Sequence, residues 1–373
     1  MMPRILIIGA GIVGAAIADR VSPQAHVTII DADTPGQGTS ASSLAWLNAN
    51  KTLDPHYFAL RLTALREWAH LAEEFGKPAW YVQRGNLTWS HIDGADELSA
   101  RVKRLNAHDY PARLITAAEA QTLEPALAVS DAAVVAHFPG EGFIHGRQAV
   151  QDLSTRAQRA GARLIVRDPV VGLNVQGNRI VGVRLASAQD IAADITICAA
   201  GWRTPQILAT AGLAIPLLNP YEPGSAAPCL VATTSKSTSL RGLVHAPGIY
   251  ARPAWGGGLL LEASDIDAAI DMTTPIAKLD AHGTELLTRA QAILPKLNQA
   301  KIADLRVCVR PLPIDNFPLV GWLDQGLYVA VTHSGITLAP GLARLITQEI
   351  TTGELTDHLA PYRPDRGGYP DRC

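Results

Sequence analysis

The sequence predicts an α/β protein in which a Rossmann-like dinucleotide-binding domain is combined with a second, mainly antiparallel (α+β) domain. Two observations predict the first domain. An apolar run leads into three glycines spaced G-x-G-x-x-G within residues 5–14, and a second apolar run at 27–30 ends in Asp31. A third observation predicts the second domain, because short apolar runs alternate with turns between residues 213 and 305. A chain of 373 residues is long enough for both domains.

Each glycine of the first motif has its own physical role. Gly9 allows the turn off the strand, Gly11 lets the backbone approach a pyrophosphate, and Gly14 lets the helix pack closely on the strand. The helix that begins near Gly11 directs its unpaired N–H groups at that pyrophosphate. Asp31, about twenty residues further on, is suited to accept hydrogen bonds from ribose hydroxyls. The alternative is a glycine-rich turn without a ligand, and at this point a nicotinamide and a flavin dinucleotide both fit.

Composition argues against several classes of protein. The chain is 47% hydrophobic and 18% charged, as expected of a globular protein, and its net charge of -2 without a basic cluster argues against a nucleic-acid partner. No apolar run is long enough for a membrane span, and glycines interrupt the N-terminal run where a signal peptide would be continuous. The four cysteines are scattered and show no metal-ligand spacing, which predicts no metal site and a reducing, cytoplasmic setting.

The clearest helix runs from residue 54 to 75. Asp54 is a suitable N-cap, Pro55 suits the first helical position, and Gly76 suits the end. Apolar residues at helical spacing predict one buried face, and we interpret this helix as scaffold. The residues of that face are Phe58, Leu62, Leu65, Ala69 and Ala72.

Capping and turn signals predict the remaining elements. Thr116 and Glu119 form a capping box for a short helix that ends before Pro125. Hairpins are expected around Gly177 and around the glycines at 256–258. The other predicted helices span 95–108, 146–161, 275–294 and 337–350, and the other predicted strands span 163–166, 170–175, 180–185, 195–200, 230–233, 243–252, 259–263 and 327–332.

Several segments together resemble one enzyme family. The glycine motif, Asp31 and the small-residue loop 36–43 resemble the D-amino acid oxidase superfamily of FAD-dependent amine and amino-acid oxidoreductases, in particular its glycine oxidase, sarcosine oxidase and D-amino acid dehydrogenase-like members. Residues 310–321 match that family's R-P-x-x-x-D-x-x-P-x-x-G motif at every fixed position, and 334–340 resemble its H-G-x-x-x-A-P segment. The resemblance spans nearly the whole chain. It departs at Trp202, which lies one position early, and at Ser334, which stands where histidine is common while His333 is displaced by one.

The resemblance implies FAD as the cofactor and a discontinuous FAD-binding domain. That domain comprises 1–79, 144–212 and 306–373, and 80–143 with 213–305 form a substrate-binding domain. The loop 36–43 would run from the pyrophosphate toward the flavin, and the helix after Ser334 would direct its N-terminus at the reduced ring. The implied FAD contacts are Gly9, Gly11, Gly14, Asp31, Thr39, Ser40, Ser42, Val170, Ala200, Gly201, Gly335, Ile336 and Thr337.

The expected substrate is a small amine or amino acid. The resemblance assigns Arg310 to the substrate carboxylate, which a guanidinium can bind bidentately, with a protein acid as the alternative partner. Tyr250 and His333 are further substrate-binding candidates. In similar sarcosine-oxidase-type enzymes a cysteine near the position of Cys308 carries a covalent flavin link; an ordinary buried strand cysteine is the alternative.

The expected reaction is FAD-dependent oxidative deamination or dehydrogenation of an amine, by hydride transfer from the α-carbon to flavin N5, with oxygen or another electron acceptor as the second partner. An NAD-dependent dehydrogenase would leave the two C-terminal motifs unexplained. A flavoprotein hydroxylase would be expected to carry a late Gly-Asp motif, and none is found. A non-catalytic dinucleotide-binding sensor or partner subunit is the third alternative.

Overall fold

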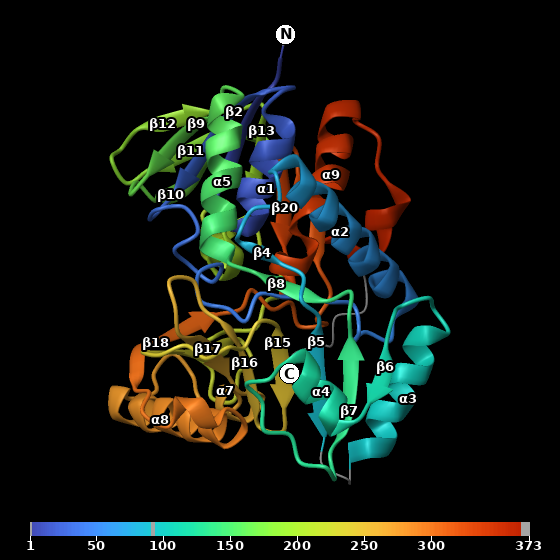
Figure 1. Cartoon of the computed structure of the whole chain (residues 1–373). Helices are drawn as coiled ribbons and strands as arrows, with labels where there is room; N and C mark the ends of the chain where they lie inside the picture. The colour runs from blue at the N-terminus through green and yellow to red at the C-terminus, as the bar shows by residue number, and fades with distance from the viewer. Residues whose placement is uncertain (1, 91–93, 367–373) are drawn as a thin grey trace.

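The centre of the protein is a six-stranded sheet assembled from segments far apart in the chain (Figure 1). The computed structural model describes residues 2–90 and 94–366. The strand order is β19-β20-β13-β1-β2-β9, and every pair is parallel except β19 with β20. This is the Rossmann-like sheet that the sequence predicts. Its strands are β1 (Arg4–Ile8), β2 (His26–Asp31), β9 (Arg163–Val166), β13 (Ile195–Cys198), β19 (Leu319–Asp324) and β20 (Leu327–Val331).

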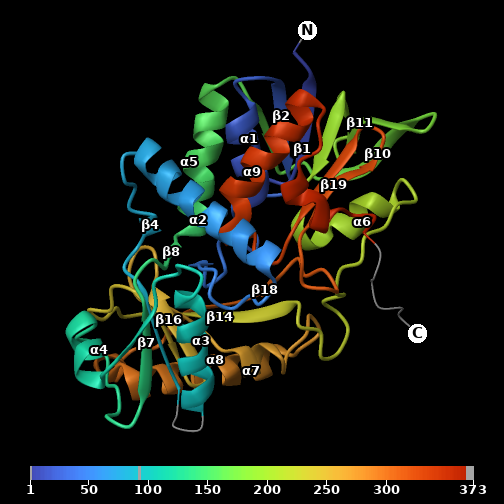
Figure 2. The ribbon, with the colours of Figure 1, turned by 90° about the vertical axis from the view of Figure 1, so that its right-hand side faces the viewer.

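Both faces of this sheet are covered, which explains why its strands read as continuous apolar runs. Ile5 and Ile7 of β1 pack with the helices on one face, while Leu6 and Ile8 pack with the second layer on the other. The helices are α1 (Ile12–Val21), α2 (Pro55–Glu74), α5 (Gly146–Arg159) and α9 (Gly335–Thr352). The other layer is the small sheet of β10 (Val170–Gln176), β11 (Arg179–Leu185) and β12 (Asp190–Ala192), with α6 (Thr204–Ala209) (Figure 2).

An eight-stranded, mainly antiparallel sheet occupies the lower half of Figure 1. Its order is β18-β14-β17-β16-β15-β5-β7-β6, and only β15 and β5 pair in parallel. The strands are β5 (Asn86–Ser90), β6 (Arg113–Ile115), β7 (Val134–Phe138), β14 (Pro228–Thr234), β15 (Leu243–Ala246), β16 (Ile249–Pro253), β17 (Leu259–Glu262) and β18 (Ile302–Val309). The accompanying helices are α3 (Ala95–Asn106), α4 (Ala117–Leu123), α7 (Ser264–Asp267) and α8 (Ile276–Ile293). A three-stranded sheet of β3 (Trp46–Leu47), β8 (Gly142–Ile144) and β4 (Tyr81–Val82) lies between the two large sheets.

We keep the division into two domains as a proposal. Strand β18 belongs to the eight-stranded sheet over its whole length, although residue 306 begins the last proposed FAD-binding segment.

Two local predictions need correction. Residues 243–252 form two strands rather than one, because Pro247 cannot donate a ladder hydrogen bond and Gly248 adopts a left-handed φ of 71° that turns the chain. The buried face of α2 also lies elsewhere: Phe58, Leu62 and Leu65 are half-buried and Ala69 is exposed. The fully buried positions are instead Tyr57, Leu60, Arg61, Ala64, Trp68, Leu71 and Ala72, since the Trp68 indole turns toward α9 and donates to the Ile336 carbonyl at 2.8 Å.

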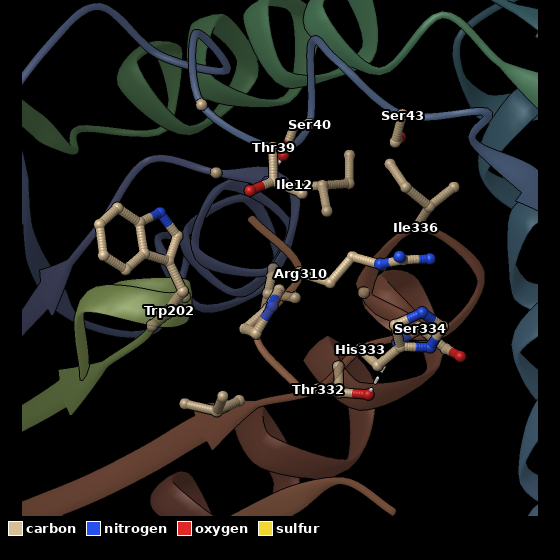
Figure 3. Close-up of a pocket in the computed structure, with 18 of the residues that line it drawn as sticks. Ile12, Thr39, Ser40, Ser43, Trp202, Arg310, Thr332, His333, Ser334 and Ile336 are labelled. Carbon is tan, nitrogen blue, oxygen red and sulfur yellow. Dashed lines mark hydrogen bonds between the residues drawn. The ribbon is translucent and has the colours of Figure 1, made fainter. Parts of the chain in front are cut away.

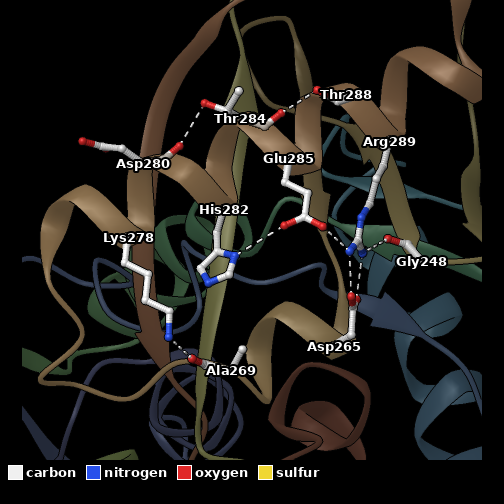
Figure 4. Close-up of polar contacts among 10 residues, drawn as sticks. All are labelled: Gly248, Asp265, Ala269, Lys278, Asp280, His282, Thr284, Glu285, Thr288 and Arg289. Carbon is white, nitrogen blue, oxygen red and sulfur yellow. Dashed lines mark hydrogen bonds and ion pairs between the residues drawn. The ribbon is translucent and has the colours of Figure 1, made fainter.

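An ion-pair cluster attaches α8 to the eight-stranded sheet (Figure 4). Arg289 of α8 donates to both carboxylate oxygens of Asp265 on α7, at 2.8 and 2.7 Å, and to Glu285 one turn away. It also donates to the Gly248 carbonyl in the β15–β16 turn, at 2.8 Å. These contacts hold α7, whose last residue, Asp267, reaches the site described next.

Candidate active site

A single cavity of about 1380 Å³ lies at the carboxyl ends of β1, β2, β13 and β20 and extends to the facing surface of the eight-stranded sheet. Small-molecule pockets usually measure about 300–1,000 Å³, so this one has room for a dinucleotide together with a substrate. Ligands of open α/β sheets bind at this edge. Figure 3 shows residues from distant parts of the chain, among them Ser40, Trp202, Arg310 and His333, around the same space.

Two of the three glycines at the β1–α1 turn, Gly9 and Gly14, are required by backbone contacts. Gly9 has a φ of 101°, and a Cβ there would lie 2.6 Å from the Ala199 carbonyl oxygen. A Cβ on Gly14 would lie 1.9 Å from the Gly9 carbonyl oxygen, so Gly14 is the point where helix and strand touch. Gly9 and Gly11 line the cavity, whereas Gly14 is not among the lining residues. Around Gly11 a Cβ would meet only the Ser40 Oγ, at 3.5 Å.

The start of α1 offers unpaired donors to the cavity. The Ser40 Oγ accepts from the Ile12 N–H at 3.0 Å, but the N–H groups of Val13 and Gly14 have no hydrogen-bond partner within residues 2–90 and 94–366. At the end of β2, the Asp31 carboxylate accepts from the Ala10 N–H at 2.6 Å and the Asp33 N–H at 2.8 Å. Each carboxylate oxygen retains a lone pair for a hydroxyl, and burial raises the Asp31 pKa.

The loop predicted to cradle the cofactor is tied to both halves of the site. The Thr39 hydroxyl donates to the Val309 carbonyl at 2.6 Å, next to Arg310. Thr39, Ser40 and Ser43 line the cavity, but Ser42 is not among the lining residues.

The remaining cofactor candidates meet at the same cavity. Val170 lines it at the start of β10, and Ala200, Gly201 and Trp202 line it after the end of β13. Gly335, Ile336 and Thr337 line it at the start of α9, where no side chain caps the helix. Their N–H groups have no hydrogen-bond partner in the part of the chain that the structure describes. The partial positive charge of this helix end therefore faces the cavity.

These features fit FAD. Two helix N-termini with unpaired N–H groups suit negative charge, one on the pyrophosphate and one on the reduced ring, and the carboxylate of Asp31 suits a ribose. The residue contacts themselves remain predictions.

The sequence left two possible partners for Arg310, a substrate carboxylate and a protein acid, and the structure leaves room for both. The Arg310 Nη2 donates to the Asp267 carboxylate at 3.1 Å and to the Pro228 carbonyl at 2.8 Å. Its Nη1 has no partner among the described residues, and Arg310 lines the cavity. A protein acid thus holds one edge of the fork, and the other edge is free for a single-sided contact with an anion.

His333 lies beside this arginine, in the connection from β20 to α9. Its imidazole is open to the cavity but surrounded by protein. This desolvation, together with the positive charges of Arg310 and Arg61, lowers its pKa to about 4, so the ring is neutral near pH 7.

The sequence did not single out Arg61, and the interpretation of α2 as pure scaffold is wrong. Arg61 and Tyr57 line the cavity. Arg61 donates to the Ser334 Oγ at 2.6 Å, to the Asn48 Oδ1 at 3.0 Å and to the Asn48 carbonyl at 2.9 Å. The sequence feature that could have identified Arg61 is its place as the single arginine at helical spacing from Tyr57, Ala64 and Trp68, on a face that is otherwise apolar.

A wall of aromatic side chains faces the cavity from the eight-stranded sheet, and the sequence patterns did not identify most of them. His245 on β15 pairs across the sheet with Tyr250 on β16, which pairs with Glu262 on β17. The His245 ring lies between Trp46, at 4.1 Å, and Tyr250, at 4.6 Å between centroids. All four line the cavity. Of these residues, only Tyr250 was predicted from the sequence.

Cys308 lies on the edge strand β18, beside Cys229. Its Sγ is 2.8 Å from that of Cys229 on the neighbouring strand, and it is Cys229, not Cys308, that lines the cavity. The flavin link at Cys308 stays a prediction. Cys373 lies outside the described residues.

The aromatic wall is held from behind by a buried acid, Glu141. Its carboxylate accepts four hydrogen bonds: from Trp46 at 2.8 Å, Asn50 at 2.8 Å, Asn86 at 3.0 Å and Tyr110 at 2.5 Å. Burial raises its pKa from 4.5 to about 7, although all four donors act in the opposite direction.

A pH-dependent stability follows from Glu141. The unfolded chain loses this proton near pH 4.5 and the folded protein near 7, so the stability due to the raised pKa is full below pH 4.5 and is lost as the pH rises through 7. Across that window we expect the free energy of unfolding of wild type, relative to Glu141→Gln, to fall by about 3 kcal/mol. Urea unfolding at a series of pH values measures this difference in free energy of unfolding. The variant Glu354→Gln, at an exposed position, is the control. Parallel curves for wild type and Glu141→Gln would contradict the assignment.

Two other kinds of feature do not occur among the described residues. No helix there is long and apolar enough to cross a membrane. Within the same residues, no group of three His, Cys, Asp or Glu side chains is arranged to hold a metal ion.

Comparison with known proteins agrees with this geometry. Residues 4–349 match the family described as FAD dependent oxidoreductase. Glycine oxidase of Geobacillus kaustophilus is 26% identical over 96% of this chain and 95% of its own sequence. Its crystal structure superimposes with a TM-score of 0.82 over 99% of this chain and 100% of that one.

Two further solved structures share the fold. Iminodiacetate oxidase from a Chelativorans species has a TM-score of 0.82 and 25% identity, over 97% of this chain and 99% of its own. L-amino acid deaminase from Proteus myxofaciens has a TM-score of 0.83 and 17% identity, over 99% and 94%. The family match selects FAD over a nicotinamide and confirms the predicted Rossmann-like class. With the family matching almost the entire chain, the protein belongs to the FAD-dependent oxidoreductases.

Proposed function

We propose that the protein oxidises an amino acid or a related primary or secondary amine, with FAD bound along β1, α1 and the start of α9. The observation that carries the proposal is the single cavity, in which the FAD candidates other than Gly14 and Ser42 share one space with Arg310. The similarity to a glycine oxidase and to an iminodiacetate oxidase supports the substrate class. Bound FAD supplies the two-electron acceptor for a hydride from the substrate carbon that carries nitrogen.

The protein's own groups would bind and orient the substrate. The Nη1 edge of Arg310 suits one carboxylate oxygen, with Asp267 holding the guanidinium in place. His333 is neutral and adds no charge that would repel an amine. Orientation and electrostatics, rather than a strong protein base, would then account for the rate.

The test uses the purified protein as isolated. Its absorbance spectrum should show a flavin band at about 450 nm, and anaerobic mixing with a substrate amine should bleach this band. The panel comprises glycine, D- and L-amino acids, N-methyl amino acids and cyclic imino acids. Their N-acetylated forms serve as controls, because these lack a basic nitrogen. A flavin that no amine in the panel bleaches would contradict the proposal. Re-oxidation by air, compared with an artificial dye, then identifies oxygen or another acceptor as the second partner.

A further inference from the structure

Lys51 is a cation on the cavity wall, and the carboxylates of Glu141, Glu262 and Glu97 act on its charge without forming an ion pair with it. Its Nζ lies 5.2 Å from the Trp46 ring centroid and 5.5 Å from that of Tyr250. It makes no ion pair or hydrogen bond within residues 2–90 and 94–366, and it lines the cavity. Aromatic faces attract an ammonium group but do not neutralise it. Lys51 therefore keeps its hydrogen-bond donors available to a ligand.

The surface under Lys51 is rigid because Glu141 holds it from behind. Glu141 accepts from the Trp46 indole and from the Asn86 Nδ2. The Asn86 Oδ1 therefore faces the His245 Nδ1, 2.9 Å away. Because this oxygen can only accept a hydrogen bond, the His245 Nδ1 carries the proton. Glu141 is fully buried and accepts four hydrogen bonds, so its carboxylate cannot turn to pair with Lys51.

Charges alternate from Lys51 toward Arg310 along the same wall. Lys51 lies over Tyr250, Tyr250 pairs across strands with Glu262, and Glu262 lies beside Asp267, which binds Arg310. The Arg310 guanidinium reaches the Pro228 carbonyl on β14, and β17 separates β14 from β16, which carries Tyr250. Neighbouring strands are about 4.8 Å apart, so the two cations lie roughly two strand spacings from each other. Glu262 lines the cavity between them. A ligand with two negative ends and a positively charged nitrogen in the middle would complement this order.

We propose that Lys51 binds a second anionic group of the substrate, so that the enzyme prefers amines carrying two carboxylates, such as amino dicarboxylic or N-carboxyalkyl amino acids. One carboxylate binds the free edge of Arg310 and the other binds Lys51. This proposal rests on the proposed function, since it concerns the same substrate, but the binding measurement below does not need turnover.

The kinetic test compares iminodiacetate with sarcosine, which has a methyl group in place of the second carboxymethyl group. For Lys51→Met holoenzyme we expect KM for iminodiacetate to rise about tenfold, with kcat little changed and sarcosine within about twofold. Lys51→Arg should restore most of the affinity because the charge returns. Lys278→Met, an exposed lysine on α8 that donates to the Ala269 carbonyl outside the cavity, is the matched control (Figure 4). Equal weakening of both substrates would overturn the proposal.

A binding test separates this proposal from the proposed function. Titration calorimetry of the holoenzyme with glutarate and with butyrate, neither of which has an amine to oxidise, reports the second carboxylate alone. Glutarate should bind more tightly than butyrate to wild type, and Lys51→Met should remove that difference. If no amine reduces the flavin of the wild-type protein but glutarate still binds more tightly than butyrate, only the proposed function fails. If glutarate and butyrate bind alike, or if Lys51→Met loses FAD instead of discrimination, the role of Lys51 is overturned.

Discussion

Replacing Gly14 with alanine should abolish FAD binding and lower the stability of the protein by about 3 kcal/mol or more. The new Cβ would lie 1.9 Å from the Gly9 carbonyl oxygen and 3.3 Å from the Ile7 Cγ2. The nearest of these atoms is backbone, so α1 has to move off β1, and its N-terminal amides move with it. Flavin absorbance per polypeptide and the midpoint of urea unfolding measure the two effects.

Gly11→Ala is the matched control for this change. A Cβ there meets only a hydroxyl at 3.5 Å, so the polypeptide should fold with nearly the stability of wild type. FAD affinity should still fall, because the added methyl group occupies the place where the backbone approaches the pyrophosphate. A Gly14→Ala protein with full FAD content and an unchanged midpoint would show that α1 does not depend on this close contact.

Arg310→Met should lower kcat/KM for a carboxylate substrate roughly thirty-fold, which corresponds to about 2 kcal/mol for one charge-assisted hydrogen bond. FAD content should be unchanged. The loss is that of a one-sided contact, because Asp267 already holds the Nη2 edge of Arg310. Steady-state kinetics with an amino acid and with the amine that lacks its carboxylate separate this role from a general loss of folding.

Two variants sharpen the arginine prediction. Arg310→Lys keeps the charge and should recover part of the affinity, since an ammonium group binds a carboxylate without the planar fork. Asp267→Asn should tighten carboxylate binding, because it removes the negative charge that competes for Arg310, while the new amide oxygen can still accept from the Leu230 N–H. Unchanged kinetics for Arg310→Met on the amino acid would mean that Arg310 serves only to neutralise Asp267 and Glu262.

Sequence patterns predicted much of the FAD side of the site because the contacts there are local. Gly9, Gly14 and Asp31 lie within one strand–helix–strand unit, where glycine spacing and a strand-ending acid have direct geometric consequences. The substrate side depends on contacts between distant segments. Arg310 was found through its motif, but its pairing with Asp267 depends on α7, which only the folded sheet brings close.

The sequence by itself determined the Rossmann-like sheet, the preference for a dinucleotide and, through the similarity of its motifs, the flavin family. Periodicity and glycine spacing act over a few residues, so a linear pattern records them. Only the tertiary structure decided that Arg61 on α2 reaches the cavity and that Glu141 holds Trp46 directly and His245 through Asn86. It also decided that Lys51 lies over the rings of Trp46 and Tyr250. These depend on burial and on the alignment of strands from separate parts of the chain, and neither is encoded in the local spacing of residues.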